Sequence, residues 1–432
     1  MSFLENNQAK LWRTYKAFSA KKYYSGGEFL IYRISKILAS ICSISAVVIL
    51  GVILLSEQFL PEKFYSENGD VVSLPGIYGR FFTVKSNYGI SEPAISTEEI
   101  SRSAKIQFMG TIPVKEVSIT VTDEKIVTIC GSPFGVKMFT DGVLVVGFSE
   151  IKSSEGPCCP ALEAGLEKGD IIKSVNGKDV FTNEEVAQSI ENCSGENINF
   201  KVLRKDNIIS INVLPKMLAD NSGYKAGFWV RDSAAGIGTM TFYDPKTMTF
   251  AGLGHAVCDV DTGGAILFSS GEITPAAITK IRKGVSGAPG ELGGVFTGGD
   301  IGTVSINNET GLYGTLDYEI KGFSAPIGLK QDIYEGAAVI YSTLDGTEVT
   351  EYDIEIEQIN LSDNSMTKNM VIRVTDEDLI ELSGGIVQGM SGSPIVQDGK
   401  LVGAVTHVFV NDPAKGFGIF AENMMEMAEK CR

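Results

Sequence analysis

One serine is a candidate catalytic residue because small residues surround it. Ser391 lies in the segment GMSGSP (389–394), between the apolar runs 385–387 and 395–396. Glycines on both sides of a serine allow a tight turn that exposes the hydroxyl and points backbone N–H groups toward one spot. That geometry suits an acyl-transfer nucleophile with its oxyanion hole. A glycine-rich hairpin without chemistry is the alternative.

A serine nucleophile needs a general base, most often a histidine. The chain contains only two histidines, His255 and His407. His255 lies in the segment AGLGHAVCD (251–259) and precedes the serine, as the base does in the chymotrypsin chain order. His407 follows the serine on an apolar strand pattern, so we expect a core histidine there, with the lining of a substrate pocket as the alternative. We therefore take His255 as the candidate base.

The third member of such a site is an acid that orients the histidine. Many carboxylates lie between His255 and Ser391, and Asp376 is the best placed because it follows a strand pattern shortly before the serine segment. Asp378 and Asp259 are competitors, and each of these acids could equally be a turn residue. The residues alone leave this choice open.

A metal site is a further possibility, because His255, Cys258, Asp259 and Asp261 are close in sequence. Their spacing matches no common zinc pattern. The two aspartates begin like a calcium loop, but Ser270 stands where the loop glutamate should be. We predict neither a metal nor another cofactor.

Length and charge limit the class of protein. A chain of 432 residues with a net charge of −16 suggests two to four domains and argues against a nucleic-acid-binding protein, which would carry a basic face. The 48 glycines with only 14 prolines indicate tight turns rather than disorder.

The N-terminal region differs in charge from the rest. Residues 1–36 carry seven Lys and Arg against two Glu, whereas residues 37–56 carry no charge at all. About 20 apolar residues of helix cross a bilayer, and the basic side stays in the cytoplasm. We therefore predict a basic cytoplasmic head (1–36), a transmembrane signal anchor (37–56) and an extracytoplasmic bulk. A cleaved signal peptide is the alternative, but its apolar part is usually shorter.

A middle segment resembles a bacterial PDZ domain. Residues 57–130 are expected to form a spacer and leading strands, and residues 131–216 contain the sequence PALEAGLEKGDIIKSVNG (160–177), followed by a helical pattern and two strands. PDZ domains bind an extended peptide as an added strand, with a loop of N–H groups for a terminal carboxylate. By position, the resemblance assigns that loop to Phe134, Gly135 and Val136. A small sandwich-like spacer domain is the alternative.

Residues 217–432 are rich in glycine and in short apolar runs bounded by turns. Such a pattern is typical of one double β-barrel or sandwich domain. The whole chain is therefore expected to be mostly β, with a single N-terminal transmembrane helix, an α+β PDZ-like domain and a C-terminal barrel domain.

Three stretches carry a more specific resemblance: GIVQGMSGSP (385–394), VTHVFVNDP (405–413) and Lys283-Gly284. Together with the anchor and the PDZ-like segment, they resemble the sporulation stage IV protein B peptidases of spore-forming Firmicutes. The resemblance implies a chymotrypsin-like double β-barrel at 217–432. It also implies Ser391 as nucleophile, His255 as base, Asp376 as orienting acid, and an oxyanion hole formed by the N–H groups of Gly389 and Ser391.

The same resemblance implies a biological role. Such a peptidase is secreted from the forespore into the space between the two spore membranes. There it cleaves a membrane-bound regulator of an intramembrane protease and so activates the processing of a late mother-cell sigma factor. It also cleaves itself, which we expect to happen in the spacer and to release the peptidase. A non-catalytic PDZ adaptor and a general extracytoplasmic quality-control serine protease are the alternatives.

Overall fold

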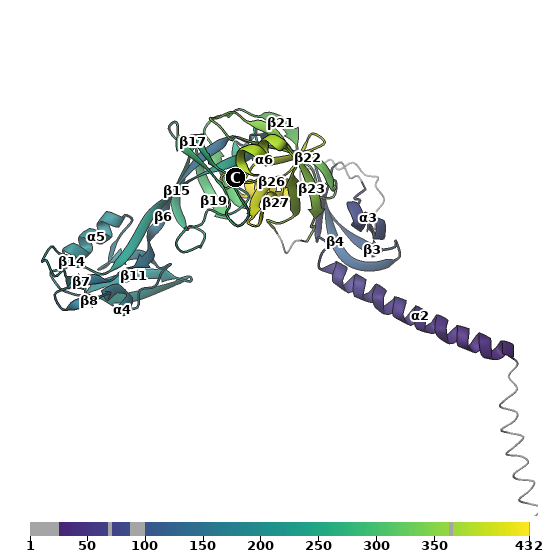
Figure 1. Ribbon diagram of the computed structural model, residues 1–432, viewed down its shortest axis with the longest axis horizontal. Helices are drawn as coiled ribbons and strands as arrows, with labels where there is room; N and C mark the ends of the chain where they lie inside the picture. Colours follow the sequence, from purple (N-terminus) through teal and green to yellow (C-terminus); the bar gives the residue numbers. More distant parts are fainter. Residues whose placement is uncertain (1–25, 68–70, 87–99, 363–365, 432) are drawn as a thin grey trace, which may run out of the picture. The chain divides into compact units, whose positions relative to one another are not determined.

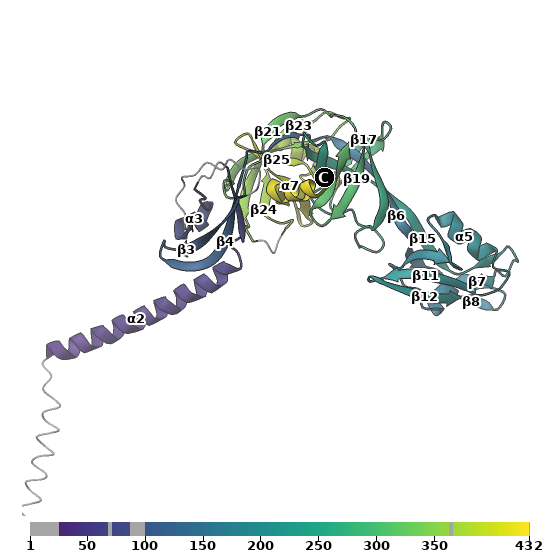
Figure 2. The same cartoon turned by 180° about the vertical axis from the view of Figure 1, so that it is seen from behind.

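The computed structural model describes residues 26–67, 71–86, 100–362 and 366–431 (Figures 1 and 2). It is mostly β, with 50% strand and 17% helix, as the sequence predicts. Residues 1–60 and 61–432 form two separate compact units. Most of the predicted basic head, residues 1–25, lies outside the described part of the chain.

The first unit consists of one long helix, α2 (Gly26–Glu57). Its segment Tyr32–Glu57 has 26 residues and contains an 18-residue stretch with a mean hydropathy of 2.8, and its side chains are largely exposed. A helix of this length can cross a bilayer, and an exposed apolar surface is what lipid would cover. The helix contains the predicted span 37–56 and fits a single-pass membrane anchor.

Four strands between residues 63 and 122 form a sheet within the region 57–130, for which the sequence predicts a spacer and leading strands. Its order is β1–β4–β3–β2, with β1 parallel to β4. Its strands are β1 (Lys63–Glu67), β2 (Phe82–Ser86), β3 (Ile100–Phe108) and β4 (Ile112–Thr122), with the short helix α3 (Gly76–Phe81) before β2. Alternate side chains such as Phe64 and Ile106 are fully buried, as the period of a strand requires.

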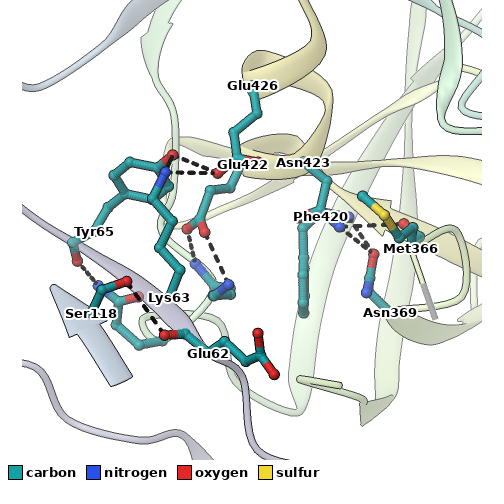
Figure 3. Close-up of polar contacts among 12 residues, drawn as sticks. Glu62, Lys63, Tyr65, Ser118, Met366, Asn369, Phe420, Glu422, Asn423 and Glu426 are labelled. Carbon is teal, nitrogen blue, oxygen red and sulfur yellow. Dashed lines mark hydrogen bonds and ion pairs between the residues drawn. The ribbon is translucent and has the colours of Figure 1, made fainter. Parts of the chain in front are cut away.

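This sheet is joined to the C-terminal helix α7 (Ala421–Ala428) by polar contacts. Lys63 and Tyr65 of β1 both bind the carboxylate of Glu426 (Figure 3). Beneath them Lys330 Nζ lies 3.3 Å from Glu422 Oε1, and both side chains are about 95% buried. Burial raises the pKa of Glu422, and the nearby ammonium group of Lys330 opposes that shift. The joint therefore depends on a buried ion pair.

The first barrel is a closed ring of six antiparallel strands. Its order is β6–β17–β19–β20–β16–β15, and β15 pairs back with β6. The strands are β6 (Pro133–Phe148), β15 (Phe228–Tyr243), β16 (Thr249–Gly252), β17 (Phe268–Arg282), β19 (Gly302–Asn308) and β20 (Gly311–Leu316). Outside the ring, β18 (Glu291–Phe296) pairs with β17, and β5 (Ile126–Ile129) joins β15 to β21 (Phe323–Pro326).

The second barrel is also a closed ring of six strands, in the order β22–β23–β24–β27–β26–β25. The strands are β22 (Gly336–Ser342), β23 (Thr350–Ile359), β24 (Met370–Val374), β25 (Pro394–Gln397), β26 (Lys400–Phe409) and β27 (Asp412–Phe420). The helix α6 (Glu377–Ser383) connects β24 to the serine segment, and α7 and the short 3-10 helix η1 (Glu429–Cys431) end the described chain. Two six-stranded barrels in tandem confirm the predicted chymotrypsin-like double barrel.

The PDZ domain is inserted into the first barrel, between β6 and β15 (Figures 1 and 2). Residues 133–139 of β6 pair with the barrel half of β15, whereas residues 144–148 pair with its PDZ half. The insert contains β7 (Ile151–Ser153), β8 (Gly156–Cys158), α4 (Pro160–Glu163), β9 (Ile171–Val175), β10 (Lys178–Asp179), α5 (Asn183–Glu191), β11 (Ile198–Arg204), β12 (Asn207–Val213), β13 (Lys216–Met217) and β14 (Tyr224–Lys225). Each long strand therefore belongs to both domains.

This insertion overturns the predicted carboxylate-binding loop. Phe134, Gly135 and Val136 lie in the barrel half of β6, buried between β15 and β17. A side chain at Gly135 would meet the ring of Phe296 at 2.3 Å, so the glycine serves close packing rather than a ligand. The prediction was wrong because a Phe-Gly-Val sequence is compatible with a buried strand as well as with a loop.

We expect the joint at α7 to be sensitive to loss of one charge. The change Lys330→Met leaves the Glu422 carboxylate buried without its partner, which costs about 3–5 kcal/mol. Thermal unfolding of the full chain in detergent, followed by circular dichroism, should show a clearly lowered midpoint. Lys63→Met removes a half-exposed cation at the same joint and should lower the midpoint much less, because exposed pairs contribute little. Equal effects of the two changes would contradict a dominant role for the buried pair.

Candidate active site

The serine segment forms a tight turn between α6 and β25. Gly389 has φ = 100° and Gly392 has φ = 94°, a region that favours glycine. A side chain at Gly392 would meet the carbonyl oxygen of Thr239 at 2.0 Å, so no other residue fits there. The two glycines that flag this segment in the sequence are therefore required by its backbone.

Two threonines of β15 hold this turn against the first barrel. Thr239 donates two hydrogen bonds to the turn. Its Oγ1 donates to the Gly389 carbonyl (2.9 Å), and its backbone N–H donates to the Ser391 carbonyl (3.0 Å). Thr241 Oγ1 donates to the Gly392 carbonyl (2.7 Å). Both threonines are buried. These three bonds fix the backbone of the turn against β15.

Two of those N–H groups are open. Within the described residues, the backbone N–H groups of Gly389 and Ser391 have no acceptor, whereas those of Met390 and Gly392 bond the carbonyls of Val387 and Val405. Open N–H groups next to an exposed hydroxyl are what an oxyanion hole requires. The geometry is compatible with the predicted oxyanion hole.

His255 follows β16 on a turn with positive φ at Leu253 (66°) and Gly254 (68°). Its Nδ1 lies 2.8 Å from the carbonyl oxygen of Ala256, which can only accept, so Nδ1 carries the proton. The other nitrogen, Nε2, therefore carries the lone pair of a base. Burial lowers the pKa of His255, and the bond to Ala256 opposes that shift.

Ser391 and His255 line one pocket between the barrels. The Oγ–H of Ser391 donates to the Thr406 carbonyl (2.8 Å) rather than to His255. The pocket wall carries no Asp, Glu, Lys or Arg among the described residues and is otherwise mostly apolar: Val136, Ile237, Leu253, Val257, Val260, Pro289, Ile386, Val387, Val408 and Val410. The two residues are thus brought together in an uncharged environment.

His407 also belongs to this pocket, so the expectation of a core histidine was wrong. Its side chain is partly open to solvent in the pocket, and its ring lies 5.1 Å from that of His255 between centroids. Burial and the neighbouring His255 lower the pKa of His407 to about 4, and Lys368 acts in the same direction. His407 is therefore neutral near pH 7 and lines the pocket, the alternative that the sequence left open.

The structure does not bring Asp376 to this pair. Its carboxylate caps α6, with Oδ1 accepting the Leu379 N–H (2.8 Å) and Oδ2 facing the Asp353 N–H (3.4 Å). Asp259 binds Arg231 and the N–H groups of its own turn, and Asp378 is exposed on α6. Asp259 thus has structural partners of its own, and none of the three acids lines the pocket.

The PDZ domain has a groove elsewhere than predicted. It lies between α5 and the PDZ half of β15, where Ala187 and Ile190 of the helix face residues 226–230. Trp229 is 63% exposed at this edge. A helix beside a strand edge is the arrangement in which PDZ domains add a peptide strand. Sequence reasoning missed these residues because residues 226–230 lie beyond the predicted PDZ segment.

Comparison with known proteins agrees with this reading. Residues 222–425 match the family model for SpoIVB peptidase S55, and residues 153–204 match the model for the PDZ domain. The first match includes both Ser391 and His255.

Curated relatives cover less of the chain. A protein described as a putative zinc metalloprotease from Brucella suis is 27% identical over 141 residues, which is 31% of this chain and 34% of that protein. A second, from Nostoc sp., is 32% identical over 111 residues, or 22% of this chain and 30% of that protein. The chain thus spans about a third of the length of the curated relatives it matches. No group of three metal-binding side chains occurs in the part of this chain that the structure describes.

The Rv3671c protease from M. tuberculosis is a structural neighbour. Its active form is 15% identical with a TM-score of 0.28, and the match covers 46% of this chain and 74% of that protein. Its inactive form has a TM-score of 0.25 at 14% identity, covering 45% and 84%. The double barrel therefore rests on the strand pairings above, and the enzyme class on the family match. Residues 222–425, which include Ser391 and His255, thus match a SpoIVB peptidase S55 domain, and the chain also carries a PDZ domain.

Proposed function

We propose that the chain is a membrane-anchored, self-processing signalling endopeptidase of sporulation. Its target would be a membrane-bound regulator of an intramembrane protease, cut in the space between the two spore membranes so that a late mother-cell sigma factor is processed. Three features support this role: the family match, the apolar helix α2 and the PDZ groove. The observation that carries the chemistry is the placement of Ser391 and His255 in one pocket.

The pocket supports acyl transfer by a serine. Rotation about χ1 of Ser391 would move its hydroxyl proton from the Thr406 carbonyl toward Nε2 of His255. Nε2 then takes that proton as Oγ bonds to the substrate carbonyl carbon, and returns it to the leaving amine as the peptide bond breaks. The N–H groups of Gly389 and Ser391 would hold the oxyanion, and water then releases the acyl group. Asp376 is left out of this scheme because its carboxylate caps α6.

The residues that line the pocket favour one kind of substrate side chain. An apolar surface without charged groups favours uncharged, apolar substrate side chains and disfavours charged ones, which would lose hydration without a partner. The PDZ groove would hold a second, extended segment of the target. A target would therefore offer both an apolar cleavage site and an extended segment for the groove.

The nucleophile can be tested directly. Incubation of the full chain in detergent with a fluorophosphonate probe should label the parent and leave Ser391→Ala unlabelled, because Ser391 is the one serine in the described wall of the pocket. Ser393→Ala is the matched control, since Ser393 lies in the same turn but its hydroxyl contacts Ser342. Labelling of Ser391→Ala at the parental rate would contradict the proposed nucleophile.

The pH dependence follows from the environment of His255. A general base acts in its neutral form, so activity is lost only as the pH falls through its pKa. Because burial lowers that pKa below the ordinary value of 6.5, we expect half-maximal labelling below pH 6.5. The titratable neighbours are His407 and Cys258, with Lys368 acting on His407. His407→Gln should leave the half-point in place, and a half-point above pH 7 would be inconsistent with a buried base.

The PDZ groove can be separated from the chemistry. Ala187→Glu places a charge in the groove, whereas Gln188→Glu places the same charge on the other side of α5. With the Ser391→Ala chain as substrate in trans, the first variant should cut several-fold more slowly than the second, and both should react equally with the small probe. Equal cutting by the two variants would argue against a role of the groove in substrate binding.

A further inference from the structure

A chain of hydrogen bonds leads from His255 through one peptide group to Asn307. His255 Nδ1–H donates to the Ala256 carbonyl (2.8 Å), and the Val257 N–H donates to Asn307 Oδ1 (2.7 Å). That carbonyl and that N–H belong to the same peptide group. The imidazole and the carboxamide therefore bind opposite ends of one dipole, and each bond polarises the group for the other.

The Asn307 carboxamide has one orientation that satisfies its surroundings. Its Nδ2 donates to the carbonyl of Val257 (3.0 Å) and to the carbonyl of Ile266 (3.2 Å). With the amino group facing two acceptors, the oxygen has to face the Val257 N–H. An aspartate would turn one oxygen toward those two carbonyls, so the position favours an amide over an acid.

Asn307 stands on a rigid element. It is partly buried near the end of β19, directly before the turn into β20. In that turn Asn308 Oδ1 accepts the N–H (3.0 Å) and the hydroxyl (2.8 Å) of Thr310. A residue fixed in this way can hold a neighbouring loop in one geometry, which a flexible side chain could not do.

We propose that Asn307 is a positioning residue that, through the Ala256–Val257 peptide, sets the tautomer and orientation of His255 in place of a triad carboxylate. This inference rests on the proposed role of His255 as base. Asp376 and Asp259 have other partners, Asp378 is exposed on α6, and the described wall of the pocket contains no carboxylate. In chain order Asn307 also stands between the base and the nucleophile, where the third member of a triad is expected in the chymotrypsin arrangement.

The tautomer can be observed without any measure of activity. Because the chain has only two histidines, protein labelled with 15N-histidine gives two imidazole signals, and His407→Gln assigns them. At pH 7 the parent should show His255 with the proton on Nδ1. In Asn307→Ala that preference should weaken, whereas in Asp376→Asn it should persist. An unchanged tautomer in Asn307→Ala would overturn the proposal.

Kinetics supply a second readout on the full chain. Asn307→Ala should slow fluorophosphonate labelling about 10- to 100-fold, because a small misplacement of a catalytic group has effects of that size. Asn307→Asp keeps an acceptor for the Val257 N–H but adds a charge that favours the imidazolium, so its half-maximal labelling should shift to higher pH than in the parent. This variant also serves if the alanine variant does not fold. A merely structural role would not move the pH profile.

Asp376→Asn is the matched control, because asparagine still caps α6 while the charge is lost. It should label at close to the parental rate. Strong slowing of Asp376→Asn, or parental rates and profiles in both Asn307 variants, would overturn the proposal. Failure of the proposed function looks different, since it would appear as labelling of Ser391→Ala.

Discussion

The three hydrogen bonds from Thr239 and Thr241 to the serine turn are the constraint on which the site depends. They tie the carbonyls of Gly389, Ser391 and Gly392 to β15, so the turn of the second barrel is shaped by a strand of the first. A turn with two glycines at positive φ would be adaptable in isolation. Fixed in this way, the turn contributes Gly389 and Ser391 to the wall of the pocket that also contains His255.

The strand β15 also connects the serine turn to the PDZ groove. The far half of β15 lines the PDZ groove, and its near half holds the serine turn. Because β6 runs beside it along both halves, the PDZ insert and the first barrel share a continuous two-stranded ladder. A peptide bound at the groove and a peptide bound at the pocket would therefore contact opposite parts of one element.

The sequence was sufficient for features that depend on local pattern. The apolar run in α2, the strand-rich C-terminal half and the glycine pairs around Ser391 follow from periodicity and from small residues at a tight turn. Assigning Asp376 was harder, because an acid just before a helix is also the usual N-cap, and in the structure it acts as one. Asn307 gave no signal, since only the pairing of β19 with its neighbours brings it to residue 257.

The candidate serine and the candidate base could be predicted from the sequence because histidine is rare in this chain. The residues that hold them in place could not be predicted. Thr239, Thr241 and Asn307 act through backbone groups far away in sequence, so their role depends on tertiary contacts alone. The PDZ groove was misplaced for the same reason: the insertion between β6 and β15 moved the Phe134 segment into a barrel. Long-range pairing, rather than residue type, decided these positions.

The most direct test of the account is a crystal structure of the full chain after reaction with a fluorophosphonate. The account predicts a phosphonyl group on Ser391 Oγ, with one of its oxygens accepting the N–H groups of Gly389 and Ser391 and with His255 Nε2 beside Oγ. Ser391 should then have left the Thr406 carbonyl. An adduct on another residue, or a phosphonyl oxygen that faces away from both N–H groups, would contradict the central claim that this turn and His255 form the catalytic centre.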